Sequence, residues 1–233
     1  MKTKFNFLLN IVLLCSGALV NAQYNFELVK DIRPGELGSS PIAHLKEYNG
    51  KIYFSANDGS NGQEPWVTDG TTDGTVILKD IFAGSGSSLI DPEFTEYNGN
   101  IYFVARGTQG SELWVTDGTL AGTELVKDIW PGSSSSDPRF FIEYAGKVYF
   151  QARNGTAGNE LWVTDGTADG TQMVKDISPG SSSSAPSYFF KFNGLLYFIA
   201  QLSDTTGREI WVTDGTASGT SLLKDINLGT GDS

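Results

Sequence analysis

One hexapeptide recurs along this chain at an almost constant interval. Trp-Val-Thr-Asp-Gly-Thr begins at four tryptophans that are 48, 48 and 49 residues apart: Trp66, Trp114, Trp162 and Trp211. Two other markers keep the same period. A Lys-Asp-Ile tripeptide begins at Lys30, Lys79, Lys127, Lys175 and Lys224, and a Tyr-Phe pair begins at Tyr53, Tyr102, Tyr149 and Tyr197. Such a period indicates a repeat protein whose units are stabilised by stacking on one another.

Each unit contains the signals of four short strands. The first surrounds Phe94 to Tyr97, the second is of the kind at Lys51 to Ala56, the third lies at Glu112 to Asp117, and the fourth at Thr123 to Ile129. An Asn-Gly or Ala-Gly pair separates the first strand from the second, which is a hairpin signal. No helical periodicity follows residue 23, so we expect all-β structure.

The third strand carries apolar residues on both of its faces. Leu113 and Val115 point to one side, and Trp114 points to the other. A sheet sandwiched between two neighbours needs both faces apolar. We therefore expect a β-propeller-like array of four-stranded antiparallel blades, each of about 48 residues. A β-solenoid is the alternative fold.

The markers do not occur in equal numbers. Lys-Asp-Ile occurs five times and Trp-Val-Thr-Asp-Gly-Thr four times, which predicts four complete blades plus an extra strand at Phe26 to Ile32. The last copy is followed only by residues 227–233, which resemble the start of another loop. The chain is then either a fragment of a larger propeller or a four-bladed ring with a spare strand, whose unpaired edge would seek a partner.

The first 22 residues have the pattern of a secretory signal peptide. Two lysines precede an apolar run from Phe5 to Val20, and small residues suit cleavage after Ala22. The repeat domain would then span residues 23–233, and the protein would be secreted, extracellular or on the cell surface. The one cysteine, Cys15, lies in the signal segment, so the mature chain has no disulfide. No later run is long enough to form a transmembrane segment.

Acidic side chains dominate the mature chain. Removal of the two signal-peptide lysines leaves 14 basic and 27 acidic side chains, a net charge of −13. Such a surface repels phosphate backbones, so we expect no nucleic acid partner. It is compatible with calcium.

The octapeptide Glu-Leu-Trp-Val-Thr-Asp-Gly-Thr at Glu112 to Thr119 and at Glu160 to Thr167 resembles the signature of the bacterial ELWxxDGT repeat family, also described as hyalin-like repeats. The resemblance covers nearly all of residues 23–233. It implies secreted or surface proteins with propeller-like folds, commonly of Bacteroidetes-like bacteria. The family offers no defined catalytic residues, so the resemblance implies location and architecture but no reaction.

Residues that recur in every unit are best explained by the scaffold. The aspartates that precede Gly-Thr are expected to cap their own turns. Calcium binding is the alternative for this set: Asp69, Asp117, Asp165 and Asp214. The repeated tryptophans are expected in the core between blades. The repeated glutamates recur identically, so they do not supply the two unequal environments of an acid–base pair. The sequence thus predicts no catalytic residue and no required cofactor.

Positions that differ between repeats are better candidates for function. Directly after Lys-Asp-Ile stand Arg33, Phe82 and Trp130, which we predict to bind a ligand. A second variable loop runs from 57 to 63, with counterparts at 106–111, 153–159 and 201–208.

These features predict a non-enzymatic binding or adhesion scaffold for an extracellular glycan or protein. A spacer role in a longer surface protein is one alternative. The other is a polysaccharide-acting hydrolase with its active site in the central channel.

Overall fold

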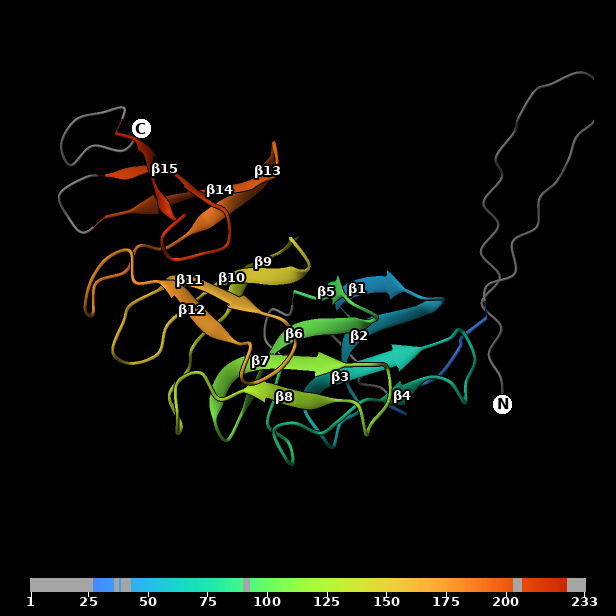
Figure 1. Cartoon of the computed structure of the whole chain (residues 1–233). Helices are drawn as coiled ribbons and strands as arrows, with labels where there is room; N and C mark the ends of the chain where they lie inside the picture. Colours follow the sequence, from blue (N-terminus) through green and yellow to red (C-terminus); the bar gives the residue numbers. More distant parts are fainter. Residues whose placement is uncertain (1–26, 36–37, 39–42, 90–92, 203–206, 226–233) are drawn as a thin grey trace, which may run out of the picture.

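The computed structural model describes residues 27–35, 38, 43–89, 93–202 and 207–225, and the predicted signal peptide lies outside them. The described residues form four antiparallel sheets of four strands, numbered β1 to β16 in chain order (Figure 1). Blade 1 consists of β1 (Ala43–Tyr48), β2 (Lys51–Asn57), β3 (Gln63–Thr68) and β4 (Val76–Ile77). Blade 2 consists of β5 (Thr95–Tyr97), β6 (Asn100–Gly107), β7 (Gly110–Thr116) and β8 (Glu124–Lys127). Blade 3 consists of β9 (Arg139–Tyr144), β10 (Lys147–Ala152), β11 (Glu160–Thr164) and β12 (Gln172–Lys175). Blade 4 consists of β13 (Ser187–Phe192), β14 (Leu195–Gln201), β15 (Arg208–Thr213) and β16 (Ser221–Lys224).

Local turn chemistry fixes the register of each blade. Asn49 and Gly50 have φ values of 52° and 73°, and they join β1 to β2 so that Tyr48 pairs with Lys51. Asparagine and glycine tolerate this left-handed backbone, which matches the twist of the two strands. The expected propeller-like array of four-stranded blades is confirmed, and the solenoid alternative is wrong because each sheet is a separate unit.

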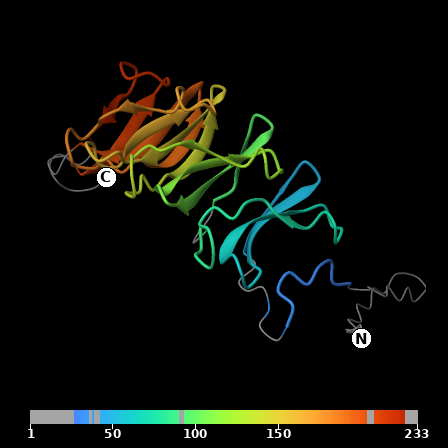
Figure 2. The same cartoon turned by 90° about the horizontal axis from the view of Figure 1, so that it is seen from below.

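The hydrophobic core lies between consecutive blades, which stack one after another along the chain (Figure 2). Between blades 1 and 2, for example, Val67 and Leu78 pack with Phe103 and Trp114. The four repeated tryptophans are all buried, with 4–8% of their surface exposed. Each tryptophan of blades 2 to 4 belongs to the cluster shared with the preceding blade, so their predicted place between blades is confirmed.

The first strands of blades 2, 3 and 4 lie next to one another. β9 contacts both β5 and β13, so these strands form the inner side of the array. The fourth strands lie at the opposite edge of each sheet. Side chains from different repeats can therefore meet along the inner strands.

The first Lys-Asp-Ile segment packs on blade 1 and is not part of the four sheets. Ile32 is buried against Phe54, Ala56 and Trp66. Within the described residues, no helix is long and apolar enough to cross a membrane.

Candidate functional site

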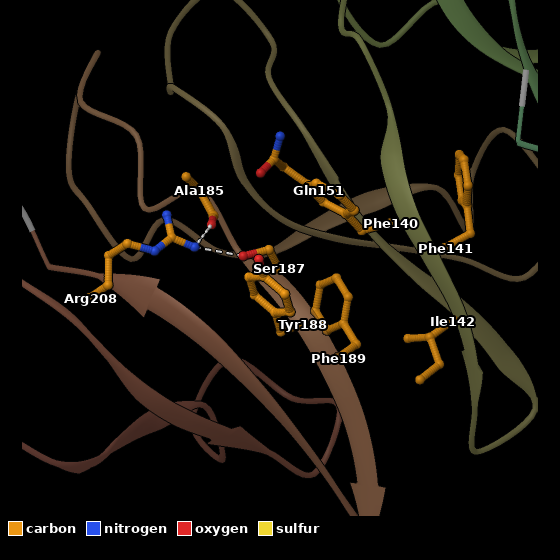
Figure 3. Close-up of a pocket in the computed structure, with 9 residues that line it drawn as sticks. All are labelled: Phe140, Phe141, Ile142, Gln151, Ala185, Ser187, Tyr188, Phe189 and Arg208. Carbon is orange, nitrogen blue, oxygen red and sulfur yellow. Dashed lines mark hydrogen bonds between the residues drawn. The ribbon is translucent and has the colours of Figure 1, made fainter. Parts of the chain in front are cut away.

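A hollow of about 650 Å³ opens between the inner strands of blades 3 and 4 (Figure 3). We refer to it as the axial hollow. It is lined by Phe140, Phe141, Ile142, Gln151, Ala185, Ser187, Tyr188, Phe189 and Arg208. A largely apolar wall with a few polar groups is the usual make-up of a small-molecule site.

Irregularities in β9 and β13 determine how aromatic rings reach this hollow. Phe140 has a φ of 60° and Tyr188 a φ of 53°, and the pairing of each strand shifts register at that point. Positive φ is costly for a bulky residue, and such strain concentrates at functional sites. The bulges turn both rings outward, leaving Phe140 44% and Tyr188 81% exposed.

The same repeat position differs in every blade. It is occupied by His44 in blade 1, Glu93 in blade 2, Phe140 in blade 3 and Tyr188 in blade 4. His44 shares the positive φ, at 57°, and the shift of register. Since the scaffold tolerates four different side chains here, the fold alone does not select them.

Polar groups surround the blade 4 side of the hollow. Arg208 donates from Nη2 to Ser187 Oγ at 2.6 Å and to the Ala185 carbonyl at 3.5 Å (Figure 3). Gln151, which is 8% exposed, contributes its amide from β10. These groups offer donors and acceptors beside the aromatic rings.

Acidic residues precede the inner strands of blades 2 and 3. Asp137 lies two residues before β9, has a φ of 46° and forms an ion pair with Arg153. Arg153 Nε also donates to the Ser135 carbonyl at 3.0 Å. Glu93 lies two residues before β5 and is exposed. β5 adjoins β9, so Glu93 and Asp137 precede neighbouring inner strands, and neither residue is among those that line the axial hollow.

The predicted ligand residues Arg33, Phe82 and Trp130 lie on successive blade junctions. Phe82 is half-buried beneath the Arg106 guanidinium, 5.7 Å from the ring centroid, and Trp130 is half-buried beneath that of Arg153, at 5.4 Å. Arg33 is half-buried next to Gly59. Each therefore packs against the loop that joins the second and third strands of the next blade, and the structure does not gather the three residues at one place.

The predicted turn aspartates all make the same local bonds. Asp117 Oδ1 accepts from the Thr119 amide at 2.9 Å and from its hydroxyl at 2.7 Å. The threonine hydroxyl bond and then the amide bond lower the pKa of Asp69, and the equivalent hydroxyl bond is the first cause of the lowered pKa in the other three. In the described part of the chain, no group of three or more histidines, cysteines or acids is arranged to hold a metal. Calcium at Asp69, Asp117, Asp165 and Asp214 stays a prediction.

The repeated glutamates have a structural role that their spacing did not reveal. Glu112 is fully buried and accepts from the Ile129 amide at 3.0 Å, the Ser136 amide at 2.9 Å and the Ser136 hydroxyl at 2.5 Å. Burial raises its pKa to about 7 despite the three donors. Glu64 and Glu160 repeat the arrangement. Each glutamate ties the Lys-Asp-Ile segment to the serine-rich loop that follows it.

Comparison with known proteins supports the architecture. No protein-family model matches the chain, and no curated protein does. Among solved structures, a puromycin hydrolase is 13% identical over 82% of this chain and 29% of its own, with a TM-score of 0.50. An endo-1,4-β-xylanase from Bacteroides thetaiotaomicron is 18% identical over 79% of this chain and 72% of its own (TM-score 0.38). A family 117 glycoside hydrolase from Zobellia galactanivorans is 12% identical over 79% and 68% (TM-score 0.43).

These comparisons correct the functional prediction. Several of the matching solved structures are glycoside hydrolases, so the predictions of a non-enzymatic adhesion scaffold and of no enzyme are wrong. At such identities the likeness establishes the fold alone, and the chemistry must be argued from this chain's own residues. The sequence analysis missed the residues of the axial hollow, except that Arg208 ends the second variable loop. The detectable signal was the position occupied in turn by His44, Glu93, Phe140 and Tyr188.

Proposed function

We propose that this chain provides propeller blades of a polysaccharide-acting hydrolase and that its substrate binds in the axial hollow. The observation that carries the proposal is the junction of blades 3 and 4, where two bulged aromatic residues stand next to Arg208 and Gln151. Sugar rings have apolar faces and hydroxyl edges, so they match a wall of aromatic rings with polar groups at its margin.

Hydrolysis of a glycosidic bond needs two carboxyl groups with different roles. We assign these roles to Asp137 and Glu93, which precede adjoining inner strands. We assign the role of base or nucleophile to Asp137, which Arg153 holds by an ion pair. Glu93 then protonates the leaving oxygen as the general acid.

The test is release of reducing sugar from xylan, arabinoxylan and arabinan by the mature chain. Asp137→Asn and Glu93→Gln should each lower kcat by about 100-fold or more, because each removes a proton-transfer or nucleophilic group. Asp169→Asn is the matched control, since Asp169 is an exposed turn residue of blade 3. Absence of turnover on all three polymers, or full activity in both variants, would reject the proposal.

A second readout addresses substrate binding. Tyr188→Ala removes an 81% exposed ring and should raise KM more than it lowers kcat. Val76→Ala, at an exposed position of blade 1, should leave both unchanged.

We further propose that the protein is a secreted or surface member of the ELWxxDGT repeat family. The octapeptide and the signal-like first 22 residues support this assignment. Mass spectrometry of the exported protein should find Gln23 as its first residue, and retention of residues 1–22 would contradict export through signal cleavage.

A further inference from the structure

The outward face of blade 4 exposes side chains whose counterparts in the earlier blades are buried. Leu223 is 55% exposed, whereas the residues at its repeat position, Leu78, Val126 and Val174, are 1%, 6% and 8% exposed. Phe192 is 56% exposed, whereas its counterpart Tyr144 is 8% exposed. We call this the terminal face. Among the described residues, no following blade covers it, whereas a following blade covers each equivalent face.

The repeats show what kind of surface covers such a face. In blade 3, the equivalent face packs against Leu196, Phe198, Ala200 and Trp211 of blade 4. Blade 1 is covered in the same way by the next blade, through the equivalent isoleucine, phenylalanine, alanine and tryptophan. The matching cover for the terminal face is therefore another blade with this set.

A lysine accompanies each covered face. Lys79 donates to the Thr123 carbonyl of the next blade at 2.8 Å, Lys127 to that of Thr171 at 2.6 Å, and Lys175 to that of Thr220 at 2.6 Å. Lys224 is the next member of the series. It is exposed, and within the described residues it makes no such bond.

The terminal face is also hollowed. A depression of about 330 Å³ is lined by apolar and aromatic side chains: Tyr188, Phe190, Phe192, Tyr197, Phe198, Ile199, Ile210 and Leu223. Single exposed apolar residues are ordinary on a protein surface, but a contiguous group of this kind marks an interaction site.

The opposite end of the array shows the same contacts from the other side of a blade junction. Lys30 donates to the Thr75 carbonyl of blade 1 at 2.7 Å, and Ile32 packs on Phe54, Ala56 and Trp66. These are the contacts that the fourth strand of one blade makes with the next blade. Residues 30–32 therefore lie where the fourth strand of a blade preceding blade 1 would lie, and the described part of the chain holds no other strand of that blade.

We propose that the terminal face docks a further unit of this same repeat. One such unit would bury Leu223 and Phe192 and give Lys224 a threonine carbonyl. The proposal concerns the assembly of the propeller, and the only residue it shares with the hydrolase assignment is Tyr188, which lines both hollows.

A second copy of the chain is a poorer occupant. The surface that it would offer is the Phe54, Ala56 and Trp66 face of blade 1, and its own Ile32 covers that surface. Lys224-Asp225-Ile226 of the first copy and Lys30-Asp31-Ile32 of the second would compete for one position, because the two tripeptides are identical.

The experiment extends the mature chain after Ser233 with a copy of residues 137–167, which contains three strands of blade 3. Its melting temperature should rise by at least about 6 °C, the scale expected from burying two or three large apolar side chains in a chain of this length. Amide exchange in β16 should slow by about tenfold or more. The matched control carries Trp162→Asp in the appended copy only and should lose both effects.

Two results would overturn the proposal. One is an extended chain whose melting temperature and amide exchange in β16 equal those of the unextended chain. The other is an unextended chain that is dimeric by light scattering and becomes monomeric in Leu223→Asp, which would make a second copy the occupant.

Discussion

Replacement of the buried Glu112 by alanine should destabilise the protein more than any substitution of an exposed acid. Glu112 is the acceptor for two backbone amides that lie 17 and 24 residues away in sequence, those of Ile129 and Ser136. Alanine leaves both amides without this acceptor. The Ser136 hydroxyl is a smaller loss, because it also lies 3.4 Å from the Ser111 carbonyl.

The size of the effect follows from these contacts. A buried donor left without an acceptor costs about 1–3 kcal/mol. Two amides and the space vacated by the side chain together amount to roughly 3–6 kcal/mol, a large part of the ~5–15 kcal/mol that stabilises a typical domain. Glu112→Gln keeps one oxygen for one amide but presents NH2 to the other, so it should cost about 1–3 kcal/mol.

Urea unfolding followed by tryptophan fluorescence measures these free energies. Glu124→Ala is the matched control, because Glu124 is an exposed glutamate of β8 in the same blade. We expect Glu112→Ala to be the least stable variant and Glu112→Gln to be intermediate, with the control within about 0.5 kcal/mol of the wild type. A Glu112→Ala variant no less stable than Glu124→Ala would refute the reasoning that the repeated glutamate holds each loop to its blade.

Three other predictions concern the repeat contacts. Burial raises the pKa of Glu64 and Glu112 to about 7, so their contribution to stability is fully present below about pH 4.5 and is lost as the pH rises through 7. The free energy of unfolding should therefore fall across this range, and its slope against pH should be shallower in Glu112→Gln. A slope that this substitution leaves unchanged would contradict the prediction. Gly118→Ala should lower stability by about 1–2 kcal/mol more than Gly50→Ala, as measured from the urea midpoints. Both glycines have positive φ, but only at Gly118 does the added carbon meet Tyr53 Oη, at 2.7 Å. Equal losses in the two variants would disprove the steric argument. Lys127→Met removes a hydrogen bond between blades and should lower stability by about 1–2 kcal/mol in thermal unfolding. Lys224→Met should leave stability almost unchanged in the same measurement. Similar losses in both variants would contradict the claim that each covered face gains a lysine hydrogen bond.

The repeat made much of the fold predictable. Strand position and turn type depend on neighbouring residues, such as the Asn49-Gly50 pair, and these are visible in the sequence. The apolar residues on both faces of the strand around Trp114 correctly predicted a sheet packed between two others.

The candidate site was not predictable in the same way. The axial hollow joins residues from Phe140 to Arg208, which meet only because β9 and β13 lie next to each other. Two bulges then aim Phe140 and Tyr188 outward, and a bulge leaves no distinct mark in a six-residue strand. Attention to the repeated motif therefore led the functional prediction toward Phe82 and Trp130, which pack under arginines.

The sequence by itself determined that this chain is an array of four-stranded blades with tryptophans between them, because a period of about 48 residues repeats the same local turns and apolar pattern. Only the tertiary structure decided which neighbours surround residues at the same repeat position. Leu78 and Leu223 occupy the same repeat position, yet one is buried and the other exposed. The difference arises because burial depends on the neighbouring blade, and a residue's own sequence does not contain that neighbour.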